Sequence, residues 1–223
     1  HGWMVDSEAR KAYAAVTRSE DADAISQVLR NVYFVWLENA ALMLQEASAT
    51  YPVKHVEMAV EVTPESGTVV LFVDGLRADV ARELATHLDQ SRLEIDEVVR
   101  WVPLPTVTAN AKPGWKPLAS SLSGEGPGET FEPRLTATGV PCRTKEFRDL
   151  LAEHGWTWVE PTTSGDPSTA GWAEIGSLDK QGHSLGAKLV HHISSEIRAI
   201  VERIDGLLEA GWSKVHLVTD HGW

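Results

Sequence analysis

The sequence predicts an α/β protein in which a parallel sheet with flanking helices follows a helical N-terminal segment. Residues 68–73 form a continuous run of apolar and β-branched side chains, which is typical of a strand buried on both faces of a parallel sheet. A shorter apolar segment, residues 215–218, follows a long amphipathic stretch and indicates a second such strand. Strand, helix and strand in this order place a ligand site at the carboxyl ends of the strands.

The N-terminal part of the chain, residues 7–49, is expected to be helical. It contains neither glycine nor proline, and its apolar side chains recur at intervals of three and four, the spacing of one helix face. These side chains are Ile25, Val28, Leu29, Val32, Val35 and Trp36. Pro52 ends the pattern because proline cannot continue a helix. We interpret residues 1–65 as a helical packing unit without chemistry, in which residues 56–62 form a strand or a connection.

Residues 66–223 are assigned to the core. A helix is expected directly after the first strand, with Val80, Leu84 and Leu88 on one face. A longer amphipathic helix precedes the second strand and is closed by Gly211. Its apolar face consists of Leu189, Ile193, Ile197, Ile200, Ile204 and Leu207. Residues 111–133 and 160–171 are rich in glycine, proline and serine and are expected to be long loops.

Composition excludes several classes of protein. The chain has 223 residues, of which 43% are hydrophobic and 23% charged, so it is neither disordered, collagen-like nor a disulfide scaffold. We see no run of about 18 uncharged apolar residues and no secretory signal, and the single cysteine fits a reducing cytoplasm. The net charge of −12 repels a nucleic-acid backbone, so nucleic acid would need a local positive site such as a bound metal.

Polar side chains with metal-binding chemistry follow both strands. Taken singly, each has a structural explanation: Asp74-Gly75 is a turn, Asp179 and His183 cap a helix beginning near Ser184, and Asp220-His221 is a solvated turn. Taken together, carboxylates and imidazoles at the carboxyl edge of a sheet suit zinc, or manganese where oxygen predominates. Two such metals about 4 Å apart can clamp the attacking and leaving oxygens of a displacement at phosphorus.

A threonine hydroxyl completes this set of candidate groups. It is a poor nucleophile at neutral pH, but a divalent metal lowers its pKa, so no adjacent histidine base is required. Thr108 and Thr106 both lie in the segment Pro-Thr-Val-Thr-Ala-Asn at residues 105–110.

The order of these motifs resembles the alkaline phosphatase superfamily. The motifs are Asp-Gly after a strand, Pro-Thr-x-Thr-x-Asn, the pair Asp179 and His183 followed by Gly186, and Thr-Asp-His-Gly at residues 219–222. Residues 71–79 and 217–223 are similar to PglZ domains, and residues 141–147 support that resemblance. PglZ proteins belong to bacterial BREX-type anti-phage systems. The resemblance covers approximately residues 68–223 and implies an alkaline-phosphatase-like sheet.

The resemblance also implies roles for individual residues. One metal would be bound by Asp74, Thr108, Asp220 and His221, and a second by Asp179 and His183. Thr108 would be the nucleophile that forms a phosphothreonine, with Thr106 as the rival for this role. Asn110, Lys112 and Arg77 are the candidates for binding phosphate oxygens, and the sequence gives no reason to prefer one of them.

The chain departs from the family at its C-terminal side. The family supplies a further histidine to the second metal from a segment well beyond Asp-His-Gly. His191, His192 and His216 lie on a predicted helix and strand, where we interpret them as structural or solvent-facing. We therefore expect the chain to be a fragment truncated at its C-terminus, with a second metal that binds loosely.

The function expected from this resemblance is a metal-dependent phosphohydrolase, either a phosphomonoesterase or a phosphodiesterase or nuclease. Its expected partners are a phosphate ester, nucleic acid reached through the metal site, and other defence-system proteins, without a membrane. The alternative is a scaffold or pseudoenzyme subunit of a multi-protein defence complex. A sulfatase is set aside because the region around Thr108 lacks a modification motif. A haloacid-dehalogenase-type phosphatase is set aside because Leu76 stands where a second aspartate is needed.

Overall fold

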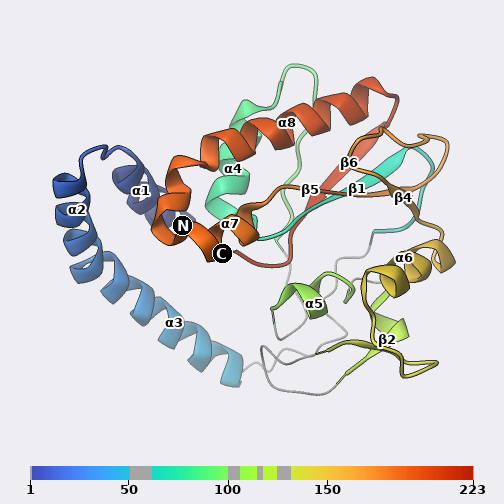
Figure 1. Cartoon of the computed structure of the whole chain (residues 1–223), viewed down its shortest axis with the longest axis horizontal. Helices are drawn as coiled ribbons and strands as arrows, with labels where there is room; N and C mark the ends of the chain where they lie inside the picture. The colour runs from blue at the N-terminus through green and yellow to red at the C-terminus, as the bar shows by residue number, and fades with distance from the viewer. Residues whose placement is uncertain (1, 51–61, 100–105, 115–117, 125–131, 223) are drawn as a thin grey trace.

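A computed structural model describes residues 2–50, 62–99, 106–114, 118–124 and 132–222. Its centre is a four-stranded sheet in the order β4-β5-β1-β6, and every neighbouring pair of these strands is parallel (Figure 1). The strands are β1 (Thr68–Val73), β4 (Thr157–Val159), β5 (Gly171–Ile175) and β6 (Lys214–Val218). A small antiparallel pair, β2 (Leu122–Ser123) and β3 (Arg134–Leu135), lies apart from it. The predicted mixed α/β class with a parallel sheet and flanking helices is confirmed.

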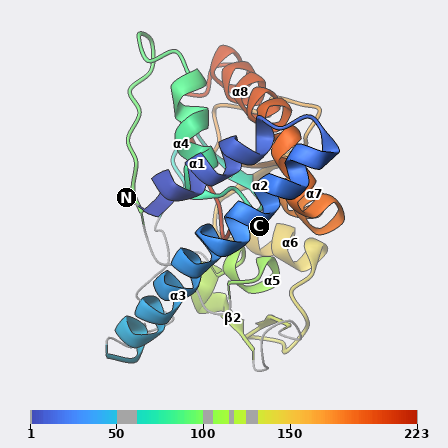
Figure 2. The same cartoon turned by 90° about the vertical axis from the view of Figure 1, so that its left-hand side faces the viewer.

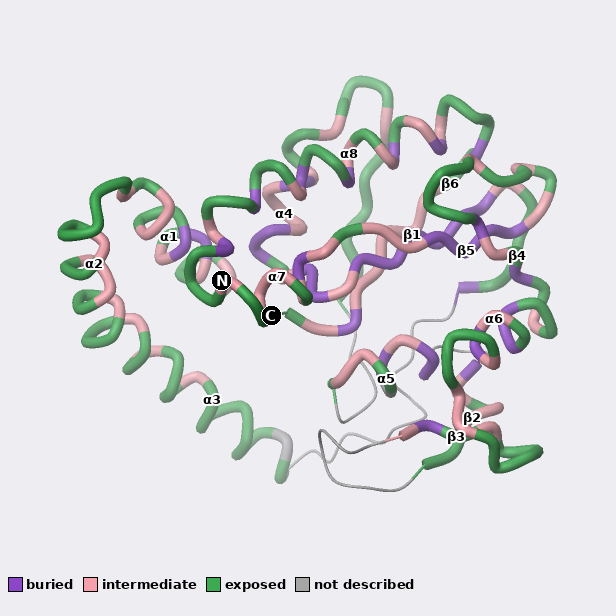
Figure 3. Tube along the Cα trace, in the orientation of Figure 1, coloured by how far each residue is buried: buried purple, intermediate pink, exposed green. Residues whose placement is uncertain are grey.

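Strand β1 is buried along its whole length, as its continuous apolar run predicts (Figure 3). Val69, Leu71 and Val73 pack into one hydrophobic cluster, whereas Val70 and Phe72 pack into another, because alternate side chains point to opposite faces of a sheet. Helices cover both faces, so a polar residue in the strand would have no solvent on either side.

The helices of the core divide between these two faces. On one face, α4 and α8 contribute Leu84 and Ile200 to the first cluster, and on the other α6 contributes Leu151 to the second. The helical elements are α4 (Ala78–His87), α5 (Thr108–Ala111), η1 (Leu118–Ser121), α6 (Thr144–Glu153), α7 (Leu178–Leu185), η3 (Gly186–His191) and α8 (Ile193–Glu209). The predicted helix after β1 is confirmed as α4, and Gly211 follows α8 with a φ of +106°.

Two expectations for the region before β6 are corrected. Asp179 and His183 do not cap a helix that begins near Ser184, because both lie inside α7, which begins at Leu178. The predicted long helix is interrupted as well. Helix α7 ends at Leu185, and Gly186, with a φ of +54°, begins the 3-10 helix η3, so that α8 begins only at Ile193. The positive φ at Gly186 therefore separates Ser184 and Leu185 from the rest of the predicted helix.

The N-terminal segment is helical, as predicted, and consists of α1 (Gly2–Ala14), α2 (Ser19–Asn31) and α3 (Tyr33–Thr50). Helix α1 contacts α4 and η3, and α3 extends away from the sheet (Figures 1 and 2). Of the apolar side chains at helical spacing, Val28, Val32 and Val35 are more than half exposed. Ile25, Leu29 and Trp36 are partly buried. Of residues 56–62, all but Val62 lie outside the described residues.

No helix in the described ranges has the length and apolar character that crossing a membrane requires.

Candidate metal centre

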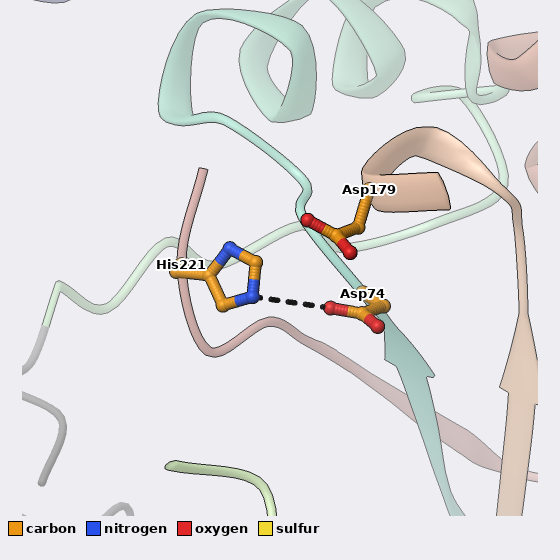
Figure 4. A group of neighbouring side chains, drawn as sticks. All are labelled: Asp74, Asp179 and His221. Atoms are coloured by element: carbon orange, nitrogen blue, oxygen red, sulfur yellow. Dashed lines mark ion pairs between the residues drawn. The ribbon is translucent and has the colours of Figure 1, made fainter. Parts of the chain in front are cut away.

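The candidate site lies at the carboxyl edge of the sheet. Asp74 directly follows β1, and Asp220 and His221 follow β6, which pairs with β1. Asp179 lies in the first turn of α7, which begins three residues after β5, the other neighbour of β1. Because these three strands are parallel neighbours, the segments that follow them meet at one place (Figure 4).

The side chains of Asp74, Asp179 and His221 form a group that could hold a metal ion. Each offers one ligand atom, and these atoms all lie within 4.8 Å of one another. The Nε2 atom of His221 is 3.3 Å from Asp74 Oδ1, the contact drawn in Figure 4. His221 Nδ1 is 3.2 Å from the Gly222 carbonyl oxygen, which can accept a hydrogen bond from Nδ1–H and leave the Nε2 lone pair for a cation.

Gly75 allows α7 to approach the end of β1. Its φ is +71°, and a Cβ atom at this position would lie 2.9 Å from Asp179 Cβ. Both the backbone conformation and the close approach therefore require glycine. The Asp74-Gly75 dipeptide is a turn, as the structural explanation says, but the same turn brings the Asp74 and Asp179 carboxylates together.

Thr108 joins this group from outside the sheet. Its hydroxyl donates to Asp74 Oδ1 over 3.1 Å and lies 3.0 Å from His221 Nε2. Thr108 is the first residue of α5, whose last residue, Ala111, is completely buried. Thr106 is exposed. The geometry thus favours Thr108 over Thr106 as the hydroxyl that belongs to the group.

Asp220 is the most deeply buried acid of the site, with 2% of its surface exposed. Its Oδ1 accepts a hydrogen bond from the His221 backbone N–H, whereas Oδ2 is buried without a hydrogen-bond partner among the described residues and lies 3.7 Å from His221 Nε2. Burial raises the pKa of Asp220 to about 6, with the Asp74 carboxylate adding to the effect and the His221 ring opposing it.

Burial likewise raises the pKa of Asp74, and the neighbouring Asp179 carboxylate adds to that shift, while the Thr108 hydrogen bond and His221 oppose it. Ionising these carboxylates in a partly buried place is costly unless a positive charge accompanies them. The orphaned oxygen of Asp220 and the oxygen and nitrogen donors around it therefore fit a divalent cation such as zinc or manganese.

His183 lies one helical turn beyond Asp179 on α7. Its Nε2 is 3.5 Å from Asp179 Oδ2, and 82% of its side chain is exposed. The structure thus brings Asp74, Thr108, Asp179, Asp220 and His221 together and places His183 at the exposed edge of the group.

The candidates for binding phosphate have partners of their own. Lys112 Nζ is 2.7 Å from the Glu174 carboxylate and lies 4.8 Å from the centre of the Phe72 ring. Arg77 Nε donates to Asp79 Oδ1 over 2.9 Å, and Arg77 also lines a pocket of about 300 Å³ together with Asp220 and His221. The Asn110 side chain lies outside what the structure describes.

Sequence reasoning missed the contacts that support the site. The Thr219 hydroxyl accepts a hydrogen bond from the Leu76 N–H over 3.1 Å and donates to the His221 carbonyl over 3.1 Å, so it joins the loops after β1 and β6. Its position in Thr-Asp-His-Gly was a usable signal. Arg10 lies in no such motif, and its contact with Asp79, 69 residues away in the sequence, leaves no pattern from which it could be predicted.

Comparison with known proteins adds no relative. No protein-family model, curated protein or solved structure matches the chain. The fold and the site define the class of the protein: an α/β protein with a parallel sheet and an Asp/His group at its carboxyl edge that could hold a metal.

The raised pKa of Asp220 predicts how the metal-free protein responds to pH. The folded state binds this proton more tightly than the unfolded state, whose carboxyl has the ordinary value of 3.8. The resulting stabilisation is complete below pH 4 and is lost as the pH rises through about 6. From this group alone, the free energy of unfolding in EDTA falls by on the order of 2 kcal/mol between pH 4 and pH 7.

Asp220→Asn removes this contribution, so its free energy of unfolding falls less over the same range than that of the unaltered protein. Urea titrations at pH 4, 5, 6 and 7 measure the difference. Asn substitution of the exposed Asp96 is the matched control and should follow the unaltered protein. Parallel pH profiles for Asp220→Asn and the unaltered protein would contradict this assignment.

Proposed function

We propose that the chain carries the catalytic site of a metal-dependent phosphohydrolase of the alkaline phosphatase superfamily, similar to PglZ domains. Thr108 is its nucleophile, and Asp74, Asp179, Asp220 and His221 hold a divalent cation. The observation that supports this proposal most is the position of the Thr108 hydroxyl, within 3.1 Å of both Asp74 Oδ1 and His221 Nε2. A role in bacterial anti-phage defence is a part of the proposal that comes from the resemblance, and a place in the cytoplasm is a part that comes from the single cysteine.

The residues of the chain orient the nucleophile. Asp74 accepts the Thr108 hydroxyl hydrogen, which fixes where the lone pairs of Oγ1 point, and His221 Nε2 contacts the same oxygen from beside Asp74. A divalent cation bound here would lower the pKa of the Thr108 hydroxyl and offset the negative charge of the phosphoryl group.

The covalent step then transfers the phosphoryl group to threonine. Thr108 gives its hydroxyl proton to solvent, and its Oγ1 forms a bond to phosphorus as the bond between phosphorus and the ester oxygen breaks. The leaving oxygen takes a proton from solvent and departs as the alcohol. Water attacks the phosphothreonine, releases phosphate and restores the hydroxyl.

A substrate panel tests the proposal. The protein, with zinc or manganese, is incubated with an aryl phosphate, an aryl phosphodiester and a single-stranded oligonucleotide, and a parallel series contains EDTA. We expect cation-dependent hydrolysis of at least one substrate, and the substrate that is cleaved distinguishes a monoesterase from a diesterase or nuclease. A protein that binds the cation and cleaves none of the three would contradict the proposal.

The two metal positions implied by the resemblance predict unequal affinities. Asp74, Asp179 and His221 converge on one position, whereas a second cation would share Asp179 with the first and otherwise depend on the exposed His183. Calorimetric titration of the EDTA-treated, dialysed protein with zinc should therefore show one tight and one weak site. His183→Ala should remove the weak site and retain the tight one. Two equally tight sites would refute this arrangement.

The second candidate is a scaffold or pseudoenzyme within a multi-protein defence complex. Helix α3 favours it, because Phe34, Leu42 and Met43 are 52%, 52% and 71% exposed, and large exposed apolar side chains gather at interaction sites. Cation binding without hydrolysis of any panel substrate would support this alternative.

A further inference from the structure

Helix α1, which belongs to the segment expected to carry no chemistry, places a buried arginine against the core. Arg10 is 7% exposed, and its Nε donates to Asp79 Oδ2 over 2.8 Å. Its Nη2 donates to Glu83, one turn further along α4. The Asp79 side chain is 1% exposed. A buried ion pair of this kind fixes both side chains, because separating them would leave a charge without compensation.

The other carboxylate oxygen of Asp79 binds Arg77, which lies next to the candidate site. Asp79 Oδ1 accepts a hydrogen bond from Arg77 Nε over 2.9 Å, so each carboxylate oxygen holds one arginine. Helix α1 reaches Arg77 a second time, since Asp6 Oδ1 lies 3.9 Å from Arg77 Nη2. Asp6 is held in turn by the Tyr33 hydroxyl, which donates to it over 2.6 Å.

Arg77 packs directly against the loop that carries the site residues Asp220 and His221. A Cβ atom at Gly222 would lie 2.6 Å from Arg77 Cγ, so the backbone of this loop touches the stem of the arginine. The Gly222 carbonyl is the group that lies 3.2 Å from His221 Nδ1. A shift of Arg77 would therefore move the Gly222 backbone and, with it, the His221 ring.

From these contacts we infer that Arg10 and Asp79 are positioning residues of the site, and that helix α1 sets the place of the Asp220-His221 loop through Arg77. This inference rests on the proposed function and deepens it, because it assigns the N-terminal segment a part in forming the site. Arg10 acts through Asp79 and Arg77 on the loop and does not itself touch the reacting atoms.

The primary experiment measures the loop without requiring turnover. Amide hydrogen exchange of residues 219–222 is compared between the unaltered protein, Arg10→Ala and Arg143→Ala, all in EDTA. Arg143 directly precedes α6, away from α1 and α4, and forms an exposed ion pair with Glu132, so it is the matched control. We expect exchange in Arg10→Ala to be about 10-fold faster or more, with Arg143→Ala unchanged. Unaltered exchange at residues 219–222 in a folded Arg10→Ala protein would overturn the inference.

Zinc affinity gives a second readout on the same proteins. Arg10→Ala should bind zinc about 10-fold more weakly, a size typical of losing a residue that supports a metal ligand. Arg10→Lys keeps the charge but not the planar fork and should recover part of this loss. An affinity equal to that of the unaltered protein would count against the inference.

Gly222→Ala decides the question without touching the buried ion pair, in case Arg10→Ala does not fold. The added methyl group collides with Arg77, so the disturbance should travel back to α1, because coupling between two positions is reciprocal. We expect the Arg10 Nε–H signal in a ¹⁵N NMR spectrum to shift or broaden in Gly222→Ala, and an unmoved signal would overturn the inference. Neither exchange nor NMR depends on hydrolysis, so failure of the proposed function and failure of this inference remain distinguishable.

Discussion

Replacing Thr108 by alanine should lower kcat for hydrolysis of the preferred phosphate ester by at least about 10³-fold, because the variant lacks the oxygen that attacks phosphorus. Thr108→Ser keeps a hydroxyl next to Asp74 and His221 and should retain a measurable part of the activity. Steady-state kinetics with saturating zinc measure both variants.

Thr106→Ala is the matched control for this prediction. Thr106 lies two residues from Thr108 and is exposed, so its removal should leave kcat within about 3-fold of the unaltered protein. The identity of the nucleophile would also appear directly, since acid quenching during turnover should trap phosphate on Thr108. Unchanged activity in Thr108→Ala would transfer the role to Thr106 or to a water molecule and contradict the account.

Asp74→Asn should weaken cation binding by more than about 100-fold and abolish hydrolysis. Among the residues that the structure describes, no other carboxylate contacts more of the site than Asp74: it accepts a hydrogen bond from Thr108, lies 3.3 Å from His221 Nε2, and shares the ligand group with Asp179. Asparagine keeps the size and one oxygen of the side chain but removes the charge that a divalent cation requires.

The same substitution should not destabilise the metal-free protein. Because burial raises the pKa of Asp74, its ionised form is disfavoured in the folded state, and a neutral side chain should leave the free energy of unfolding at pH 7 equal or higher. Urea unfolding in EDTA measures this, with Asp96→Asn, at an exposed position outside the site, as a control that should change neither stability nor zinc affinity. Full zinc affinity in Asp74→Asn would contradict the site.

The strand and helix pattern around β1 could be predicted from sequence because burial leaves a plain signal there. The uninterrupted apolar run of Thr68–Val73 exists because helices cover both faces of the strand, and the following helix is recognisable from its apolar face. Strands β4 and β5 gave no such signal. Thr157–Val159 has three residues, and Gly171–Ile175 contains Glu174, so neither resembles a buried run.

The meeting of Asp74 with Asp220 and His221 could be predicted for a related reason. Parallel strands of one sheet carry the segments after them to the same edge, and β1 and β6 are such neighbours. The way the site is supported could not be predicted. Arg10 and Asp79 are 69 residues apart and belong to different helices, and local spacing contains no information about such a pair.

The partners of the basic side chains near the site could not be predicted from the sequence either. Lys112 and Arg77 are basic residues close to the candidate nucleophile and ligands, which suggested contacts to phosphate. In the structure Lys112 pairs with Glu174, and Arg77 pairs with Asp79. Whether a basic side chain can bind a substrate or pairs with the protein depends on which acidic side chains lie within its reach. Only the folded chain shows which acids these are.

The most direct test of the account is anomalous diffraction at the zinc edge from crystals of the full chain soaked in zinc. An anomalous peak is expected about 2.0–2.2 Å from His221 Nε2 and from carboxylate oxygens of Asp74, Asp179 and Asp220, beside Thr108 Oγ1. A well-occupied zinc ion bound elsewhere, with these side chains unligated, would contradict it.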